Sequence, residues 1–326
     1  MRGETSVLCN KRNYNKSELK RGEPVNITKR QHTVPRAYLK NFSEKRKNGQ
    51  YLFTYDKKNG KIHEDNIKNA AVEKDWYTLE LSENKLAWED FYATEIEPRY
   101  EKVDRLIKTS TSALIMNRSE VIDDNTRIEI AILMIYQLFR GRTGRKYTKV
   151  FAEKVIPEII DEAREEIGDR IREDEFADAI EKISSDDFQM MVYAEVLTDP
   201  ERLMKYARMI ASRYWILFRI EGNNEFITSD NPFTLGSIND SDDVPSHLDF
   251  LGPSNVIYYP ISSKLMIAAY DRGVFLGAME ELNKQLVILD TTKESTFIDK
   301  VNRLMVRQCD RQAFAKSRTI LKKACR

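Results

Sequence analysis

The chain has 326 residues, of which 41% are hydrophobic and 32% are charged. This length and apolar content predict a folded protein with a large core, arranged as one big domain or two small ones. Lysine and arginine together number 53, and aspartate and glutamate number 52. The chain as a whole therefore lacks the positive charge of a strong nucleic-acid-binding protein, although a local basic groove is compatible with this balance.

Three cysteines, Cys9, Cys309 and Cys325, are spread too widely for a disulfide framework, and none lies in a C-x-x-C pair. This usage favours a reducing compartment. No segment has the ~20 consecutive apolar residues of a membrane span, and the N-terminus has no apolar run typical of a signal peptide. We therefore expect a cytoplasmic protein without a membrane partner.

Residues 1–29 are polar, rich in lysine and arginine and poor in large apolar side chains, which predicts a flexible arm. Residues 30–326 are expected to form a single α+β domain. We expect three parts within it: a hairpin part at 30–82, a helical part at 83–212, and strands followed by a C-terminal helix at 213–326.

The hairpin is predicted by the aromatic, strand-like residues 51–55, which a turn connects to a return strand at 61–63. The turn contains Asn59-Gly60, a pair that readily supplies the positive φ of tight hairpin turns. A third short strand is expected at 74–79.

In the helical part, apolar residues from 84 to 109 recur at close to 3.6-residue spacing, which predicts a helix that Pro98 kinks or breaks. The polar residues around Asp123 predict the cap of a long helix that reaches Phe139. Because that helix is apolar on most sides, we expect it to be buried. Further helices are predicted at 148–167, 169–182, 186–197 and 200–212.

The last third predicts a hairpin in which residues 213–220 and 225–228 pair across a turn at 221–224. A flexible loop is expected at 238–254, where Asp, Ser, Pro and Gly are frequent. Three more strands and a helix are predicted at 256–260, 265–270, 286–289 and 293–310. Together these elements predict an α+β fold with a central helical bundle packed on a mixed or antiparallel sheet formed by the N-terminal hairpin and the C-terminal strands.

Residues 31–42 concentrate polar and aromatic side chains around His32, in a chain with only three histidines. Pro35 favours an extended backbone there, and a neutral imidazole can act as a general base, a metal ligand or a hydrogen-bond anchor. The alternative is a structural histidine tied to a backbone carbonyl. Arg36 in the same segment is a candidate substrate-binding residue.

A second polar cluster, Ser229-Asp230-Asn231-Pro232, directly follows the apolar residues Phe226 and Ile227. The end of a strand holds such groups rigidly while the loop exposes them, which suits a catalytic or binding role. The same residues also favour a turn whose side chains bond local backbone amides. Ser229 lacks the G-x-S-x-G surroundings of a nucleophile elbow.

Three further residues are candidates. Arg140 follows an apolar helix, so it either complements the helix dipole or binds an anion through its guanidinium group. Glu97 lies beside apolar positions of a predicted helix and is the inward-facing choice of the pair Glu95 and Glu97. Asn302 lies among apolar neighbours on a predicted helix and is expected to point inward.

The sequence resembles a prokaryotic family, domain of unknown function family 4238. The resemblance covers nearly the whole chain after about residue 30, with Thr33 at a position where the family usually has an aromatic residue. It implies no defined activity; the family's similarity to proteins of mobile elements and bacterial defence loci implies a setting of that kind. The segments that carry the resemblance are 31–42, 51–55, 226–232, 259–261 and 301–303.

Imidazole, carboxylate and guanidinium groups form the minimal set for phosphodiester hydrolysis, with or without Mg²⁺ or Mn²⁺. We therefore expect a hydrolase of a phosphate-containing substrate, and a nuclease is one such enzyme; nucleic acid or a nucleotide is the expected partner. The alternatives are a non-catalytic sensor that binds a nucleotide or a protein, and a purely structural polar network. The expected catalytic residues are His32, Asp230 and Glu97, and the expected substrate-binding residues are Arg36, Arg140, Ser229, Asn231 and Asn302.

Overall fold

The computed structural model describes most of the chain after residue 29. The predicted arm at 1–29, residues 77–79 of the predicted third strand, residues 238–250 of the predicted loop, and most of the predicted helix at 186–197 lie outside the described residues. The described residues are 30–76, 87–115, 121–167, 172–185, 188–190, 199–237, 251–273, 278–290 and 293–326.

One five-stranded sheet is built from the last third of the chain, in the order β11-β6-β10-β9-β8. Along β10, Leu265, Ile267 and Ala269 belong to one core cluster, while Met266 and Ala268 belong to another. This two-residue alternation means that both faces of the sheet are covered, as expected for strands that are apolar throughout. The strands are β6 (Tyr214–Glu221), β8 (Thr234–Ser237), β9 (Asn255–Ser262), β10 (Leu265–Tyr270) and β11 (Leu286–Asp290).

A second sheet joins the N-terminal hairpin to C-terminal strands, in the order β2-β3-β12-β7, with β4 also paired to β3. The predicted hairpin is present, and Gly60 in its turn has a φ of +69°. A small third sheet pairs β1 (Arg30–His32) with β5 (Val72–Lys74). The strands of the second sheet are β2 (Glu44–Arg46), β3 (Gly49–Asp56), β4 (Lys61–Asn66), β7 (Thr228–Ser229) and β12 (Gln312–Ala315).

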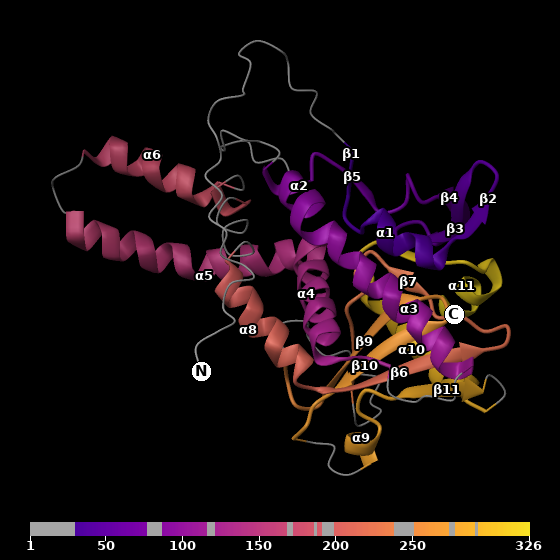
Figure 1. The fold of residues 1–326 in the computed structure, drawn as a ribbon. Coiled ribbons are helices and arrows are strands. Elements are labelled where there is room, and N and C mark those ends of the chain that lie inside the picture. Colours follow the sequence, from indigo (N-terminus) through magenta and orange to yellow (C-terminus); the bar gives the residue numbers. More distant parts are fainter. Residues whose placement is uncertain are drawn as a thin grey trace, which may run out of the picture.

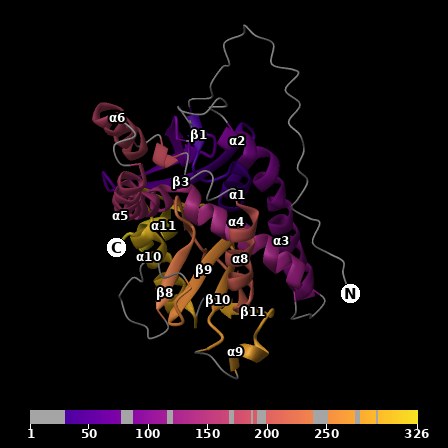
Figure 2. The same cartoon turned by 90° about the vertical axis from the view of Figure 1, so that its left-hand side faces the viewer.

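Helices cover the two faces of the C-terminal sheet. The helices α4 and α8 lie over one face, and α10 lies over the other (Figures 1 and 2). The predicted long buried helix is α4, and the Asp123 side chain caps it by accepting a hydrogen bond from the backbone N–H of Thr126. These helices are α4 (Asp124–Arg140), α8 (Pro200–Ala211) and α10 (Ser295–Gln308).

The remaining helices are mostly peripheral. Figure 1 shows α5 and α6 extending away from the rest of the molecule as an arm. Among the described residues, no helix combines the length and the apolar composition needed to cross a membrane. These helices are α1 (Arg36–Leu39), α2 (Ala87–Phe91), α3 (Tyr100–Ile115), α5 (Arg142–Ile167), α6 (Glu173–Ser184), α9 (Ala278–Glu281) and α11 (Arg318–Ala324).

The α+β class is confirmed, and the N-terminal hairpin does pair with C-terminal strands. Two details differ from the predictions. The strands of the described residues form three sheets, so the other C-terminal strands are not continuous with the hairpin. The predicted hairpin of 213–220 with 225–228 is wrong, because β6 pairs with β10 and β11 while β7 pairs with β12. Periodicity finds strands but does not select their partners.

Candidate functional site

A pocket of about 650 Å³ opens between the N-terminal elements and the helices that follow them. This volume lies within the range of small-molecule sites. Its walls come from β1, from α1 and the residue that follows it, from β3, the end of β4, α2 with the irregular turns that follow it, and the last residue of α4. The lining residues are His32, Arg36, Ala37, Lys40, Gly49, Gln50, Asn66, Ile67, Lys68, Glu89, Tyr92, Ala93, Glu97 and Arg140.

The pocket brings together four of the eight residues predicted from sequence: His32, Arg36, Glu97 and Arg140. They come from segments up to 108 residues apart in the sequence. Two of them are in direct contact, because Arg140 Nη2 donates to the backbone carbonyl oxygen of His32 at 2.7 Å. The pocket therefore contains imidazole, carboxylate and guanidinium groups, all from the first half of the chain.

His32 ends strand β1, and its Nε2 lies 3.3 Å from the carbonyl oxygen of Ile67. A carbonyl can only accept, so Nε2 carries the proton and Nδ1 is the accepting nitrogen of the neutral ring. Burial and, to a lesser extent, the positive charges of Arg36, Arg140 and Arg30 together lower the pKa of His32 to about 4, against the opposing effect of the Ile67 hydrogen bond. The imidazole is therefore neutral at pH 7.

Arg140 is the last residue of α4 and is only 6% exposed. Its guanidinium carbon lies 4.1 Å from the ring centre of Tyr92, within the range of a cation–π contact. With its hydrogen bond to the backbone of His32, this contact holds the guanidinium group in one place at the pocket wall. Such a fixed cation suits recognition of an anion.

The wall opposite α1 is an irregular helix. After α2 the chain forms a π-helical turn at Tyr92–Ile96 (η2) and a 3-10 turn at Glu97–Arg99 (η3), before α3 begins at Tyr100. Pro98 has no backbone N–H to donate, so the predicted break is confirmed and has a physical cause. The break leaves Glu97 at the pocket, and π-helical turns are frequent at functional sites.

A second carboxylate on the same wall was not predicted. Glu89 in α2 accepts a hydrogen bond from Gln31 Nε2 at 2.8 Å. Gln31 is 1% exposed, so this bond fixes Glu89 from the buried side. The two carboxylates of the pocket thus both come from the α2–η3 wall, whereas its cations come from α1 and the residue that follows it, from the end of α4 and from the turn after β4.

The charges of the lining do not cancel. Four cationic side chains, those of Arg36, Lys40, Lys68 and Arg140, face two carboxylates, Glu89 and Glu97. Lys40 also pairs with a carboxylate outside the lining, with its Nζ 2.6 Å from Asp104 Oδ2. The excess positive charge favours an anionic ligand.

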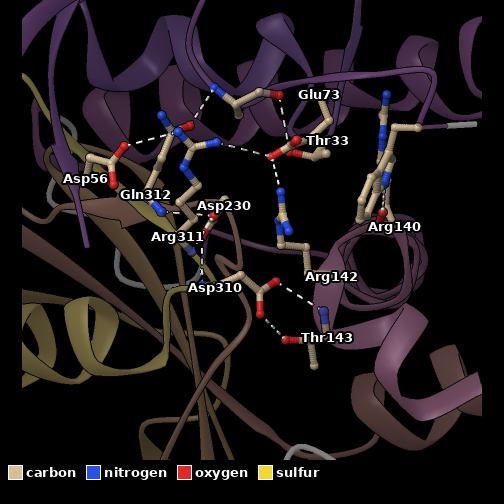
Figure 3. A network of polar contacts seen from close by, with 12 residues as sticks. Thr33, Asp56, Glu73, Arg140, Arg142, Thr143, Asp230, Asp310, Arg311 and Gln312 are labelled. Atoms are coloured by element: carbon tan, nitrogen blue, oxygen red, sulfur yellow. Dashed lines mark hydrogen bonds and ion pairs between the residues drawn. The ribbon is translucent and has the colours of Figure 1, made fainter. Parts of the chain in front are cut away.

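Asp230 lies elsewhere, in a buried network (Figure 3). Its carboxylate accepts hydrogen bonds from the backbone N–H groups of Asp310, Arg311 and Gln312 at 2.7–2.9 Å. None of its hydrogen bonds within the described residues goes to His32. Burial and the neighbouring Asp310 carboxylate raise the pKa of Asp230 to about 7, against the effect of the three N–H donors. Its contacts are those of an anchor for the turn before β12.

The network around Asp230 also connects elements of the pocket region. Asp310 accepts from both the backbone N–H and the hydroxyl of Thr143, so it caps the start of α5. Gln312 Oε1 accepts from the N–H of Ala71, whose carbonyl oxygen accepts from the N–H and hydroxyl of Thr33. Asp230 thereby supports the backbone next to His32 through a chain of bonds without reaching the pocket.

The three remaining predicted residues are buried and do not line the pocket. The hydroxyl of Ser229 contacts Met305 Sδ and accepts from the N–H of Asn231, whose side chain donates to the Gln308 carbonyl. Asn302 accepts from the N–H of Ile227 and donates to the carbonyl of Glu225. These bonds stabilise the irregular chain at 225–231, and they place Ser229, Asn231 and Asn302 away from the pocket lining.

A family model described as protein of unknown function (DUF4238) matches residues 30–319. The chain belongs to this family. No curated protein and no solved structure matches the chain. Membership of the DUF4238 family thus identifies relatives by sequence, and the chemistry of the site has to be argued from its residues.

In this DUF4238 protein, no group of three or more His, Cys, Asp and Glu side chains among the described residues is arranged to hold a metal ion. Glu89 and Glu97 are the carboxylates that line the pocket.

Sequence reasoning missed several lining residues, including Lys40, Gln50, Asn66, Lys68 and Glu89. One of them carried a usable signal: Lys40 follows Arg36 by four residues, and a helical turn at α1 places such a pair on one face. Asn66 and Lys68 lie at and just after the end of β4, where nothing in the local sequence distinguishes a pocket wall from an exposed turn.

Proposed function

We propose that this protein is a hydrolase that binds a phosphate-containing substrate in the pocket around His32. The observation that supports this most is the positively charged lining next to a neutral imidazole. Phosphate oxygens are good acceptors for arginine and lysine, and Arg140 is held in place by its contacts with Tyr92 and the His32 backbone.

His32 is the proposed general base, taking a proton at Nδ1 from the water that attacks phosphorus. The bond from phosphorus to the leaving oxygen breaks, and solvent water protonates that oxygen as it departs. Its pKa of about 4 makes it a weak base in the empty pocket. A bound phosphate offsets the charges of Arg36 and Arg140, which raises the imidazole pKa while substrate is present. The hydrogen bond from Nε2 to the Ile67 carbonyl stabilises the imidazolium that forms. Glu97 is proposed to orient the attacking water or to contribute a carboxylate to a substrate-bound divalent ion.

The test is hydrolysis of a panel of nucleotides, phosphodiesters and oligonucleotides, with and without Mg²⁺ or Mn²⁺. We expect His32→Gln to lower kcat by about 10²–10⁴-fold, the usual contribution of a general base. His63→Gln is the matched control, because His63 lies exposed on β4 and does not line the pocket. Equal activity of wild type and His32→Gln, or no turnover of any substrate, would reject the hydrolase.

A second candidate is a sensor that binds a nucleotide without turnover. The low pKa of His32 favours it, because a base this weak contributes little to proton transfer unless the ligand shifts it. A ligand of the folded state raises the melting temperature. Thermal stabilisation by a nucleotide that Arg140→Gln abolishes, with no product formed, would identify the sensor.

We also propose a bacterial cytoplasmic setting, in a defence or mobile-element context. The two cysteines among the described residues, Cys309 and Cys325, are both free thiols. This usage supports a reducing compartment. The defence context is supported only by the family resemblance, and protection of a host strain against a phage panel, compared with a His32→Gln strain, tests it.

A further inference from the structure

Residues 30–76, which supply most of the pocket lining, carry an excess of positive charge. They contain eleven lysines and arginines against six aspartates and glutamates, whereas the whole chain has a net charge of +1. Residues 1–29 are also basic, with seven lysines and arginines against three glutamates, so the acidic excess lies after residue 76. A local basic surface on an otherwise neutral protein indicates a site for a polyanion.

Part of this charge lies at the rim of the pocket, on the β2–β3 hairpin. Lys45 pairs directly with Gln50 across the hairpin, and Gln50 lines the pocket. Side chains of directly opposite residues lie on the same face of a sheet, about 5 Å apart at Cβ. Lys45 is thus beside the pocket mouth, and Lys47 follows in the turn before Gly49, another lining residue.

These cations are available to a ligand. Arg36, Lys45, Lys47 and Lys68 are exposed, and none forms an ion pair with any residue that the structure describes. Their neighbour Arg46 differs, because Glu44 and Glu64 accept from its guanidinium at 3.0 and 2.7 Å. Within the described part of the chain, carboxylates thus neutralise Arg46 but neither Lys45 nor Lys47 on either side of it.

We propose that the substrate is a single-stranded nucleic acid, with one nucleotide in the pocket and the phosphates of the adjoining nucleotides on Lys45 and Lys47. This inference rests on the proposed phosphate-binding role of the pocket and names its substrate class. Separate cations inside the pocket and along its rim match a ligand with repeating phosphates, whereas a phosphopeptide would bring one phosphate and leave the rim unused.

A single strand fits better than a duplex. A base paired within a duplex has to be unstacked and unpaired before it can enter a pocket of this kind, and a single strand avoids that cost.

The experiment measures binding of fluorescent mononucleotides and of single-stranded DNA and RNA of three, six and twelve nucleotides, with a twelve-base-pair duplex for comparison. The protein is the full chain in which His32→Gln prevents turnover. We expect affinity to rise from the mononucleotide to the hexanucleotide, and the duplex to bind more weakly than the single strand. Affinity for the longer strands should fall with salt concentration, since each phosphate contact releases counterions.

Two double variants distinguish the contribution of the rim lysines to binding from that of the pocket. Lys45→Gln/Lys47→Gln should weaken hexanucleotide binding by about tenfold and reduce the log–log salt slope by about 1.4, or 0.7 for each lost phosphate contact. It should leave mononucleotide binding unchanged. Lys58→Gln/Lys61→Gln removes the same charge at the other end of the β3–β4 hairpin and should leave both affinities unchanged.

Two failures are distinguishable. If mononucleotides bind but longer strands bind no more tightly, or if the control pair weakens them as much as the rim pair does, the single-strand inference is overturned and the proposed phosphate site stands. If neither mononucleotides nor strands bind, the proposed function fails with it. Preference for the duplex would also overturn the inference.

Discussion

The hydroxyl oxygen of Tyr38 lies 2.8 Å from that of Thr228, although the two residues are 190 positions apart in the sequence. Tyr38 donates its proton to the carbonyl oxygen of Pro260 at 2.5 Å, so Thr228 is the donor in the bond between the two hydroxyls. Both side chains are completely buried. The two polar segments singled out from the sequence therefore meet in the interior, while the pocket lies on the other side of residues 31–42.

Replacing Tyr38 with Phe should destabilise the fold and leave the pocket intact. The change removes one donor and leaves the Pro260 carbonyl and the Thr228 hydroxyl buried without that partner, at a cost of about 1–3 kcal/mol. The free energy of unfolding from urea titrations measures this. Tyr51→Phe, at a half-buried position, is the control and should change it by less than about 0.5 kcal/mol. Similar losses for both variants would refute the role of the Tyr38 hydroxyl.

Asp230→Asn should lower the free energy of unfolding more than any conservative change at the pocket does. An amide offers one acceptor oxygen and places an NH₂ group against backbone N–H groups of residues 310–312 that now donate to the carboxylate. We expect a loss of about 3–5 kcal/mol in the free energy of unfolding.

Asp178→Asn, on the exposed surface of α6, is the control for Asp230→Asn and should have no measurable effect. A variant at 230 that kept full stability but lost activity would instead restore Asp230 to the catalytic group, as the sequence had indicated.

A structural feature of this protein can be predicted from the sequence when residues close to it in the chain determine it. The hairpin turn at Gly60, the cap at Asp123 and the break at Pro98 are set by neighbours in the chain, and all three are confirmed. The partner of β6 is not set by neighbours, because pairing depends on contacts distant in sequence. The surroundings of Asp230 are not set by neighbours either, because its three hydrogen-bond donors come from residues 310–312.

The pocket itself illustrates a second limit. A polar residue that stands out because of its neighbours in the sequence either belongs to a functional site or satisfies buried backbone groups, and the sequence alone does not distinguish these two roles. His32 and Arg140 line the pocket, but Ser229 and Asn302 satisfy buried backbone groups. Burial and hydrogen-bond partners make the distinction, and both are properties of the folded chain.

His32 should stay neutral throughout the physiological range. Its pKa is lowered from 6.5 to about 4, so between these values the unfolded chain binds a proton that the native state does not. The free energy of unfolding should therefore decrease as pH falls from 6.5 toward 4, and His32→Gln should reduce this dependence. Proton NMR titration measures the His32 pKa directly, because the chain has only three histidines and the His32→Gln variant identifies the His32 signal.

The same titration tests the link to the ligand. Saturating phosphate or a nucleotide should move the His32 pKa upward, because the bound anion offsets the charges of Arg36 and Arg140. Affinity should correspondingly increase as pH falls toward the His32 pKa of about 4 in the free protein. If no bound anion changes the His32 pKa, the anion does not bind next to the imidazole.

Gly49→Ala, a substitution in the pocket wall, should lower both the stability of the protein and its affinity for the phosphate ligand. Gly49 has a φ of +139°, and an added Cβ would lie 2.7 Å from Asn66 Nδ2, another lining residue. The backbone strain should cost about 1–3 kcal/mol, and the displaced Asn66 side chain should weaken binding of the phosphate ligand. Gly60→Ala separates the two effects, because Gly60 has a φ of +69° but its Cβ would meet nothing within 4 Å. It should lower stability through the backbone alone and leave affinity unchanged. Equal affinities for the two variants, measured by calorimetry, would show that the wall formed by Gly49 and Asn66 does not contact the ligand.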